Sequence, residues 1–316
     1  MQTDTTHDPP LKPVPRSAVI IANPHSGFLP HNAHRLQEAV ENLHRHGWQV
    51  ELWHTKRAGD ATSMAAQAVE QGIAMVIAAG GDGTINEIIQ GLAGSETALG
   101  VLPTGTVNVW AREMGIPLDL HDACNILVHG QTRRIDLGRV NERYFLLMVG
   151  IGFDAEVTQA VERKPLKRLG PLGYALAALW FGPGYAGFPV IVRQGDHALK
   201  TRALQVFIGN TQLYAGAFKF TWRARCDDGQ LDLCIVRKRS LPGRVLVLLD
   251  FLMRRKNRRR WVRYDTFTSI TIQTPRPIAF QIDGDPGGYT PATFTVHPGA
   301  LKVVVSHNAP AGLFSS

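Results

Sequence analysis

Short apolar runs alternate with amphipathic segments over about the first 130 residues of the chain. The runs at 18–22, 49–53, 74–79 and 98–102 have the length and composition of buried strands. Between and after them, apolar residues recur at helical spacing over 36–43 and 85–92, and a further helix is predicted over 120–128. Strands that alternate with helices are typical of an α/β layer with a mostly parallel sheet.

The pattern changes beyond residue 134, where apolar runs are separated by turn residues. Predicted strands lie at 144–149, 190–193, 204–208, 231–236, 278–282 and 301–305, with helical insertions at 155–162, 172–181 and 244–254. This half is typical of an antiparallel sandwich or barrel. The sequence therefore predicts a solvated tail at 1–15, an α/β domain at 16–134, a β-rich domain at 135–306 and a C-terminal tail at 307–316.

Three glycine-containing polar loops follow predicted strands of the α/β domain. Gly80-Gly81-Asp82-Gly83-Thr84 joins the third strand to a helix, Asn23-Pro24-His25-Ser26-Gly27 follows the first strand, and Pro103-Thr104-Gly105-Thr106-Val107-Asn108 follows the fourth. Glycines let backbone N–H groups approach phosphate oxygens, and a helix N-terminus favours an anion. In open α/β sheets, ligands bind at the carboxyl ends of the strands. The loops carry neither a P-loop lysine pattern nor a dinucleotide fingerprint, which disfavours those two folds.

Carboxylates mark three further candidate positions. Asp82 would lie beside phosphates, so we interpret it as linked to Mg²⁺, and the alternative is a helix cap in a structural turn. In the β-rich half, Asp283-Gly284-Asp285 ends a predicted strand, and the glycine would allow both acids to face one site. The alternative for this segment is a polar hairpin turn. The third position is Asp227–Asp232, and the alternative there is a β-turn that enters the next strand.

Taken in order, the three loops resemble the catalytic domain of the diacylglycerol kinases, and the bacterial lipid kinases most closely, over about residues 16–306. The resemblance implies a nucleotide-binding N-terminal domain like that of phosphofructokinase and a C-terminal antiparallel β-sandwich that binds the lipid substrate. ATP would bind in the cleft between the two domains. The implied nucleotide-binding residues are Asn23, Thr55, Gly80, Gly81, Asp82, Gly83, Thr84, Glu87, Gly105, Thr106 and Asn108.

The resemblance also assigns chemical roles. Asp285 would accept the proton of the lipid hydroxyl, Asp283 would orient it, and Asp82 would act through Mg²⁺. A magnesium ion would be held by the Asp228 carboxylate and by carbonyl groups near Arg225 and Gln230. The chain departs from the family at two positions: Asp285 stands where the motif has Glu, and Val109 stands where many members have Asp.

The net charge of the chain is +8, with 34 Lys and Arg against 26 Asp and Glu. Seven of the ten residues at 254–263 are basic, so removing them would reduce this excess to +1. This segment follows the apolar run 245–253, and basic residues at 163–168 likewise precede the apolar run 174–181. A basic amphipathic segment favours peripheral contact with an anionic membrane surface. Nucleic acid is not an expected partner, because no nucleic-acid-binding motif accompanies the charge.

The first sixteen residues contain no apolar block, which argues against a secretory signal. The stretch 169–192 carries no charge, but glycines and prolines interrupt it, so we do not expect it to span a membrane. The three cysteines, Cys124, Cys226 and Cys234, show no metal spacing and no disulfide framework, as in a reducing compartment. We therefore expect a cytoplasmic protein that associates with the inner face of the membrane.

These observations favour an ATP- and Mg²⁺-dependent lipid kinase that phosphorylates the hydroxyl of a lipid alcohol such as diacylglycerol. One alternative is an enzyme similar to NAD kinase. Another is a nucleotide-binding peripheral membrane protein with little catalytic activity, which the departures at Val109 and Asp285 motivate. The sequence leaves open which lipid is the acceptor and whether the chain forms a homodimer.

Overall fold

The N-terminal half of the chain forms a parallel sheet. In the computed structural model, residues 16–24, 26, 33–153, 155, 186–214, 216, 218–237 and 261–315 are described. The first four strands lie in the order β2-β1-β3-β4 and are all parallel: β1 (Arg16–Ala22), β2 (Trp48–His54), β3 (Met75–Gly80) and β4 (Ala98–Pro103). β3 and β4 are buried along their whole length. Their continuous apolar runs fit strands that are covered on both faces, and all four predicted strands are confirmed.

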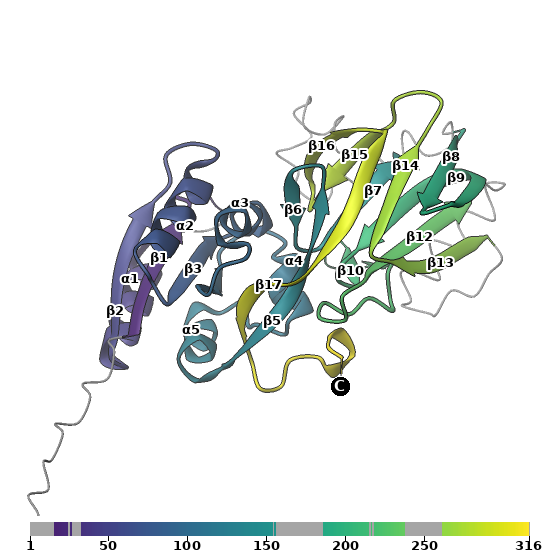
Figure 1. Cartoon of the computed structure of the whole chain (residues 1–316). Helices are drawn as coiled ribbons and strands as arrows, with labels where there is room; N and C mark the ends of the chain where they lie inside the picture. Colours follow the sequence, from purple (N-terminus) through teal and green to yellow (C-terminus); the bar gives the residue numbers. More distant parts are fainter. Residues whose placement is uncertain are drawn as a thin grey trace, which may run out of the picture.

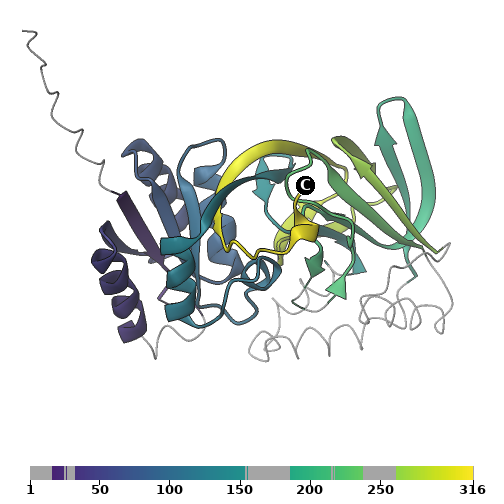
Figure 2. The same ribbon diagram turned by 90° about the horizontal axis from the view of Figure 1, so that it is seen from below.

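Five helices accompany this sheet in the described part of the chain. They are α1 (Ala33–Arg45), α2 (Asp60–Glu70), α3 (Asp82–Leu92), α4 (Val109–Glu113) and α5 (Leu120–His129). α1 packs with α5 and α2 packs with α3, and the two pairs cover opposite faces of the sheet (Figure 2). The three predicted helices correspond to α1, α3 and α5. α2 was not predicted, because its buried residues are the small alanines Ala61, Ala65 and Ala68, which give a weak periodic signal.

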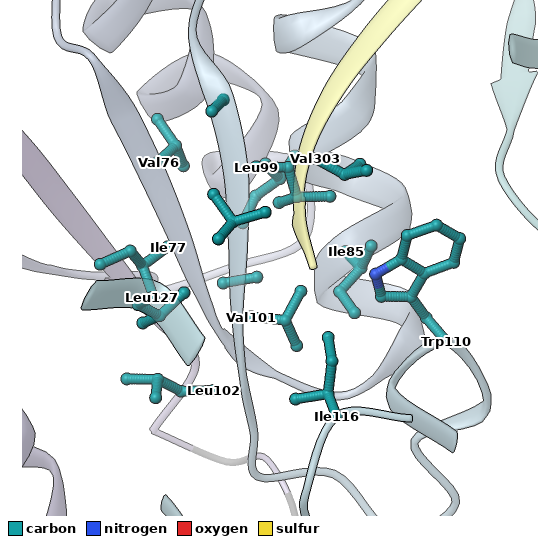
Figure 3. Close-up of a cluster of buried hydrophobic side chains, with 14 of the residues drawn as sticks. Val76, Ile77, Ile85, Leu99, Val101, Leu102, Trp110, Ile116, Leu127 and Val303 are labelled. Carbon is teal, nitrogen blue, oxygen red and sulfur yellow. The ribbon is translucent and has the colours of Figure 1, made fainter. Parts of the chain in front are cut away.

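The core of this domain lies between the sheet and its helices. Figure 3 shows Val101 of β4 on the same side as Ile85 of α3 and Trp110 of α4. Trp110 is 1% exposed and is among the largest fully buried side chains of the described residues. The short helix α4 is therefore anchored in the core, and its N-terminus, which follows the third glycine loop, is fixed with it.

The second half is antiparallel. Its strands pair into a sandwich-like domain around a second apolar core that includes Phe145, Phe280 and Phe294. The strands are β5 (Gln131–Val140), β6 (Arg143–Phe145), β7 (Met148–Gly152), β8 (Phe188–Gln194), β9 (His197–Gly209), β10 (Leu213–Tyr214), β11 (Phe218–Lys219), β12 (Leu231–Arg237), β13 (Val262–Phe267), β14 (Ser269–Gln273), β15 (Ala279–Ile282), β16 (Asp285–Tyr289) and β17 (Ala292–Val305), followed by the 3₁₀ turn η3 (Ala311–Leu313). The predicted fold class, an α/β domain followed by an antiparallel β-sandwich, is confirmed.

One predicted strand is wrong in detail. The run 144–149 forms two strands, β6 and β7, with Leu146 and Leu147 between them. The backbone N–H groups of both residues donate to the Asp283 carboxylate, at 2.8 Å and 2.9 Å, instead of to a neighbouring strand. A tertiary contact to a residue far along the chain therefore interrupts an apolar run that reads as a single strand.

The two halves share hydrogen-bonded strands. β17 pairs with β5 and β14, and at Lys302 and Val303 it pairs in parallel with β4, so the last strand of the chain joins the N-terminal sheet. β5 and β17 run together from one half of the molecule into the other (Figure 1). The boundary predicted between residues 134 and 135 falls within β5, and the domain limits stay predictions.

The helical insertions predicted at 155–162, 172–181 and 244–254 lie almost wholly outside the described residues, as does the basic segment up to residue 260. Of the helices that are described, none is long and apolar enough to cross a membrane. Cys124, Cys226 and Cys234 are all buried free thiols.

Candidate active site

Two glycine loops touch each other at the carboxyl edge of the parallel sheet. A Cβ atom added to Gly105 would lie 2.4 Å from the Gly81 Cα and 2.7 Å from the Asn108 Oδ1, so only glycine allows this approach. Asn108 fixes the loop, because its Oδ1 accepts from the Gly105 N–H (2.9 Å) and its Nδ2 donates to the Gly105 carbonyl (2.8 Å). The loops that follow β3 and β4 therefore form one continuous backbone surface.

Asp82 joins the same two loops through its side chain. Its two carboxylate oxygens accept from the Val109 and Trp110 N–H groups, at 2.9 Å and 3.0 Å, so Asp82 caps α4 rather than its own helix α3. Loss of hydration raises the pKa of this carboxyl, while the two backbone donors oppose the rise. Val109 is 8% exposed and packs in the core. Asp82 thus positions the loops, and its predicted link to Mg²⁺ stays a prediction.

Glu87 organises the loop that follows β2. Its Oε2 accepts from the N–H groups of Gly59 (3.0 Å) and Ala61 (3.3 Å), which caps α2 from a neighbouring helix. The Asp60 Oδ2 accepts from the N–H groups of Lys56 (2.9 Å) and Arg57 (3.0 Å). These contacts hold two exposed basic residues at the carboxyl end of β2, beside Thr55.

A cleft of about 490 Å³ opens at this edge of the sheet. Seven of the predicted site residues line the cleft: Asn23, Thr55, Gly81, Gly83, Thr84, Glu87 and Asp285. The rest of the lining was not among the predicted site residues: Ser26, Lys56, Arg57, Ala58 and Ala61. Gly80, Asp82, Gly105, Thr106, Asn108 and Asp283 are not part of the lining, although Asp82, Gly105 and Asn108 support it through the contacts above. Lys56 and Arg57 could have been found from the sequence as a basic pair directly after a strand.

Asp285 reaches the cleft from the second domain. It begins β16, is exposed, and makes an ion pair of 3.2 Å with Arg143 of β6. Asp283 lies elsewhere, since its carboxylate accepts from the Asn86 Nδ2 and from the backbone N–H groups of Leu146, Leu147 and Met148 at 2.8–2.9 Å. Of the two acids that were expected to face one site, Asp285 lines the cleft and Asp283 does not, and the catalytic roles predicted for both stay predictions. Asp285 faces the cleft, whereas Asp283 is enclosed by donors that fix the hairpin beneath it.

Comparisons with known proteins match both halves of this arrangement. Residues 17–140, with all three glycine loops, match the diacylglycerol kinase catalytic domain, and residues 147–305, with Asp283 and Asp285, match the YegS C-terminal NAD kinase beta sandwich-like domain. A diacylglycerol kinase of Staphylococcus saprophyticus is 31% identical over 283 residues, which cover 88% of this chain and 92% of the relative. The chain belongs to the diacylglycerol kinase family.

Other relatives support this membership. A diacylglycerol kinase of Staphylococcus epidermidis is 32% identical over 88% of this chain and 89% of its own length. A solved structure from Bacillus anthracis strain Sterne, assigned to the diacylglycerol kinases, aligns with a TM-score of 0.80 at 25% identity and covers 93% of this chain and 99% of its own. Membership of the diacylglycerol kinase family places this chain among lipid kinases.

The donors around Asp283 allow a stability prediction for this family member. Loss of hydration raises the pKa of Asp283 to about 6, and the four donors oppose that rise, so the carboxylate is ionised at pH 8. In Asp283→Asn, the amide NH₂ would replace a carboxylate oxygen and would face N–H groups that donate to that oxygen in the unchanged protein. We expect the variant to lose about 2–4 kcal/mol in the free energy of unfolding at pH 8, measured by urea denaturation.

The control for this prediction is Asp265→Asn on β13, an exposed aspartate whose side chain, among the described residues, makes an ion pair with Arg263 and accepts a hydrogen bond from the Thr266 N–H. That change should alter the free energy of unfolding by less than about 0.5 kcal/mol. If Asp283→Asn were as stable as this control, the four contacts would not hold the hairpin as described.

The second acidic segment lies apart from the cleft. The Asp228 Oδ1 accepts from the Gln230 N–H (3.0 Å) in a tight turn, and Asp136 accepts from the N–H groups of Gly229 (2.6 Å) and Gly299 (2.8 Å). Neither Arg225, Asp228 nor Gln230 lines the cleft. Across the described ranges, no group of three or more His, Cys, Asp or Glu side chains could hold a metal ion. A metal site here would depend on one carboxylate and on carbonyl oxygens, the ligand set that the family resemblance implies, and this site stays a prediction.

Asp232, at the end of the acidic turn formed by Asp227–Asp232, makes the free energy of unfolding depend on pH. Burial, reinforced by the nearby Asp228 charge, raises the pKa of Asp232 from 3.8 to about 7. Ionising this group therefore costs free energy in the folded state, so its contribution to stability falls as the pH rises from about 4 to about 7. Asparagine cannot ionise, so it avoids this cost. In chelator-containing buffer, the free energy of unfolding of Asp232→Asn minus that of the unchanged protein should increase by on the order of 3 kcal/mol from pH 4 to pH 7.5.

Urea denaturation of the two proteins at pH 4, 5.5 and 7.5 checks this expectation. The quantity to compare is the difference between their free energies of unfolding, because other groups shift both curves equally. A difference that stays constant across this range would show that Asp232 does not carry the predicted pH dependence.

Proposed function

We propose that this member of the diacylglycerol kinase family transfers the γ-phosphoryl group of ATP to the hydroxyl of diacylglycerol. The observation that carries the proposal is the composition of the cleft. Gly81, Gly83 and Thr84, at the N-terminal end of α3, line the same cavity as Asp285, which comes from the other domain. A phosphate-binding loop and a candidate base thus face one space.

The nucleotide side of the cleft is suited to a polyphosphate. The N-terminus of α3 favours negative charge, and the glycines let phosphate oxygens approach the backbone. Lys56 and Arg57 add two cationic side chains to the same lining. Phosphoryl transfer depends mainly on positioning and on neutralising phosphate charge, which these groups would supply.

Asp285 is the candidate general base. Its carboxylate is exposed in the cleft, whereas the Glu87 Oε2 in the same lining is engaged by two backbone N–H groups. A base must come within hydrogen-bond reach of the hydroxyl whose proton it accepts. An acceptor hydroxyl bound between Asp285 and the phosphates would meet this requirement.

Magnesium would supply charge neutralisation on the phosphates when it is bound. In the second domain, the donor set of the acidic turn fits a divalent cation: burial and the neighbouring charges of Asp136 and Asp227 raise the pKa of Asp228, so a cation would relieve repulsion there. The carbonyl groups of Arg225 and Gln230 would complete the set. Asp228→Asn should therefore remove any Mg²⁺-dependent rise in the thermal midpoint.

The lipid would be met at an anionic membrane surface on the cytoplasmic side. This part of the proposal rests on the sequence, where seven of ten residues at 254–263 are basic and follow an apolar run. Binding of the chain to phosphatidylglycerol vesicles, but not to phosphatidylcholine vesicles, would support it.

The function is tested by incubating the purified chain with γ-labelled ATP, Mg²⁺ and vesicles that contain one acceptor at a time. The acceptors are diacylglycerol, monoacylglycerol and a sphingoid base, with NAD in a parallel reaction without lipid. We expect label in phosphatidate. Labelled NADP would instead favour the NAD kinase alternative, and nucleotide binding without any labelled product would favour a protein with little catalytic activity.

A further inference from the structure

Arg143 connects Asp285 of the β15–β16 hairpin to Asn86 of helix α3. Its Nη2 donates to the Asn86 Oδ1 (2.7 Å) and lies 3.2 Å from the Asp285 Oδ2, and its Nη1 donates to the Pro286 carbonyl (3.5 Å). The same Asn86 donates through Nδ2 to the Asp283 Oδ2 (2.9 Å). The contacts form one chain in the order Asp285, Arg143, Asn86 and Asp283.

The orientation of the Asn86 amide is determined by its two partners. A carboxylate can only accept, so the NH₂ must face Asp283, and a guanidinium can only donate, so the carbonyl oxygen must face Arg143. Asn86 is 2% exposed on the rigid helix α3, directly after the phosphate-binding loop. Arg143 is therefore anchored to the element that begins at the proposed phosphate site.

The Asp285 side chain, by contrast, is exposed and lies on a glycine-rich turn. Its side chain is 51% exposed, and it follows Gly284, whose φ is +96°, in a hairpin that continues into Gly287 and Gly288. The Arg143 guanidinium is the ion-pair partner that the described residues give to this carboxylate. An exposed carboxylate on such a turn would otherwise sample several rotamers.

We propose that Arg143 is a positioning residue, which holds the Asp285 carboxylate in place toward the cleft by bridging it to Asn86. The inference rests on the proposed function, in which Asp285 is the base. Misplacing a catalytic group by about 1 Å can cost on the order of 100-fold in rate. The loss of Arg143 should therefore lower kcat while leaving the binding of ATP and lipid largely intact.

The test compares Arg143→Gln and Arg143→Lys with the unchanged protein and with Arg35→Gln. Arg35 of α1 is a matched control, because it also makes an ion pair with a half-exposed aspartate, Asp119, and neither residue lines the cleft. We expect Arg143→Gln to lower kcat by about 10- to 100-fold with KM values changed less than about threefold, and methylguanidine in the buffer to restore part of the loss. Arg143→Lys should lie in between, and Arg35→Gln should have the kcat of the unchanged protein.

The decisive measurement is the effect of Arg143→Gln on kcat in a protein that already carries Asp285→Asn. If Arg143 acts through Asp285, adding Arg143→Gln to Asp285→Asn lowers kcat no further. An equal loss in both backgrounds, an unchanged kcat in Arg143→Gln, or failure of both Arg143 variants to fold would overturn the proposal. These outcomes differ from failure of the proposed function, in which the unchanged protein itself yields no labelled phospholipid.

Discussion

Replacing Asp285 with asparagine is expected to lower kcat for lipid phosphorylation by roughly 10²- to 10⁴-fold. Asparagine preserves the size of the side chain but cannot accept the hydroxyl proton. Because the side chain is 51% exposed, the fold should be unaffected. The change is measured as initial rates of phosphatidate formation at saturating ATP and lipid, with the thermal midpoint recorded for each protein.

Two variants frame this prediction. Asp285→Glu keeps a carboxylate and should retain most of the activity, whereas Asp265→Asn, which removes an exposed aspartate away from the cleft, should change nothing. If Asp285→Asn kept more than about a tenth of the activity, the rate would lie outside the range for the loss of a general base, and the base would have to be sought elsewhere.

Replacing Gly105 with alanine is expected to weaken nucleotide binding. The new methyl group would lie 2.4 Å from the Gly81 Cα and 2.7 Å from the Asn108 Oδ1, and the Gly81 backbone cannot move away without separating the two loops. We expect ATP affinity to fall by more than about 10-fold and the free energy of unfolding to fall by about 1–3 kcal/mol. Isothermal titration calorimetry with ATP and urea denaturation measure the two effects.

Gly312→Ala is the control for this change, because a Cβ atom at Gly312 would meet nothing within 4 Å. It should bind ATP and unfold like the unchanged protein. If Gly105→Ala also bound ATP normally, the contact between the two loops would not be a requirement of the phosphate site.

The parallel half of the fold could be predicted from the sequence because strands that are covered on both faces form continuous apolar runs, as in β3 and β4. α4 could not be predicted, since five residues are too few to show a helical period and its N-terminus depends on Asp82, 27 residues earlier. The split between β6 and β7 likewise arises from a contact with Asp283, 137 residues from Leu146. Local patterns carry no trace of such contacts.

The residues that line the cleft were predicted better than the residues that hold them in place. The loop motifs and the family resemblance together assigned seven residues that the structure brings to one cleft: Asn23, Thr55, Gly81, Gly83, Thr84, Glu87 and Asp285. Arg143 was missed because a half-buried arginine in a short strand has no motif, and its partner Asp285 lies 142 residues away. The different surroundings of Asp283 and Asp285 could not be predicted either, because they depend on the backbone N–H groups of Leu146 and Leu147, between β6 and β7, and of Met148, which begins β7.

Transfer of the γ-phosphoryl group from ATP to diacylglycerol by the purified chain is the most direct test of the central claim. With Mg²⁺ and phosphatidylglycerol vesicles that contain diacylglycerol, we predict ADP and phosphatidate in equal amounts, and neither product when diacylglycerol is omitted. ATP binding without labelled phospholipid, or ADP accompanied only by free phosphate, would contradict the claim that the cleft between the glycine loops and Asp285 is a lipid kinase site.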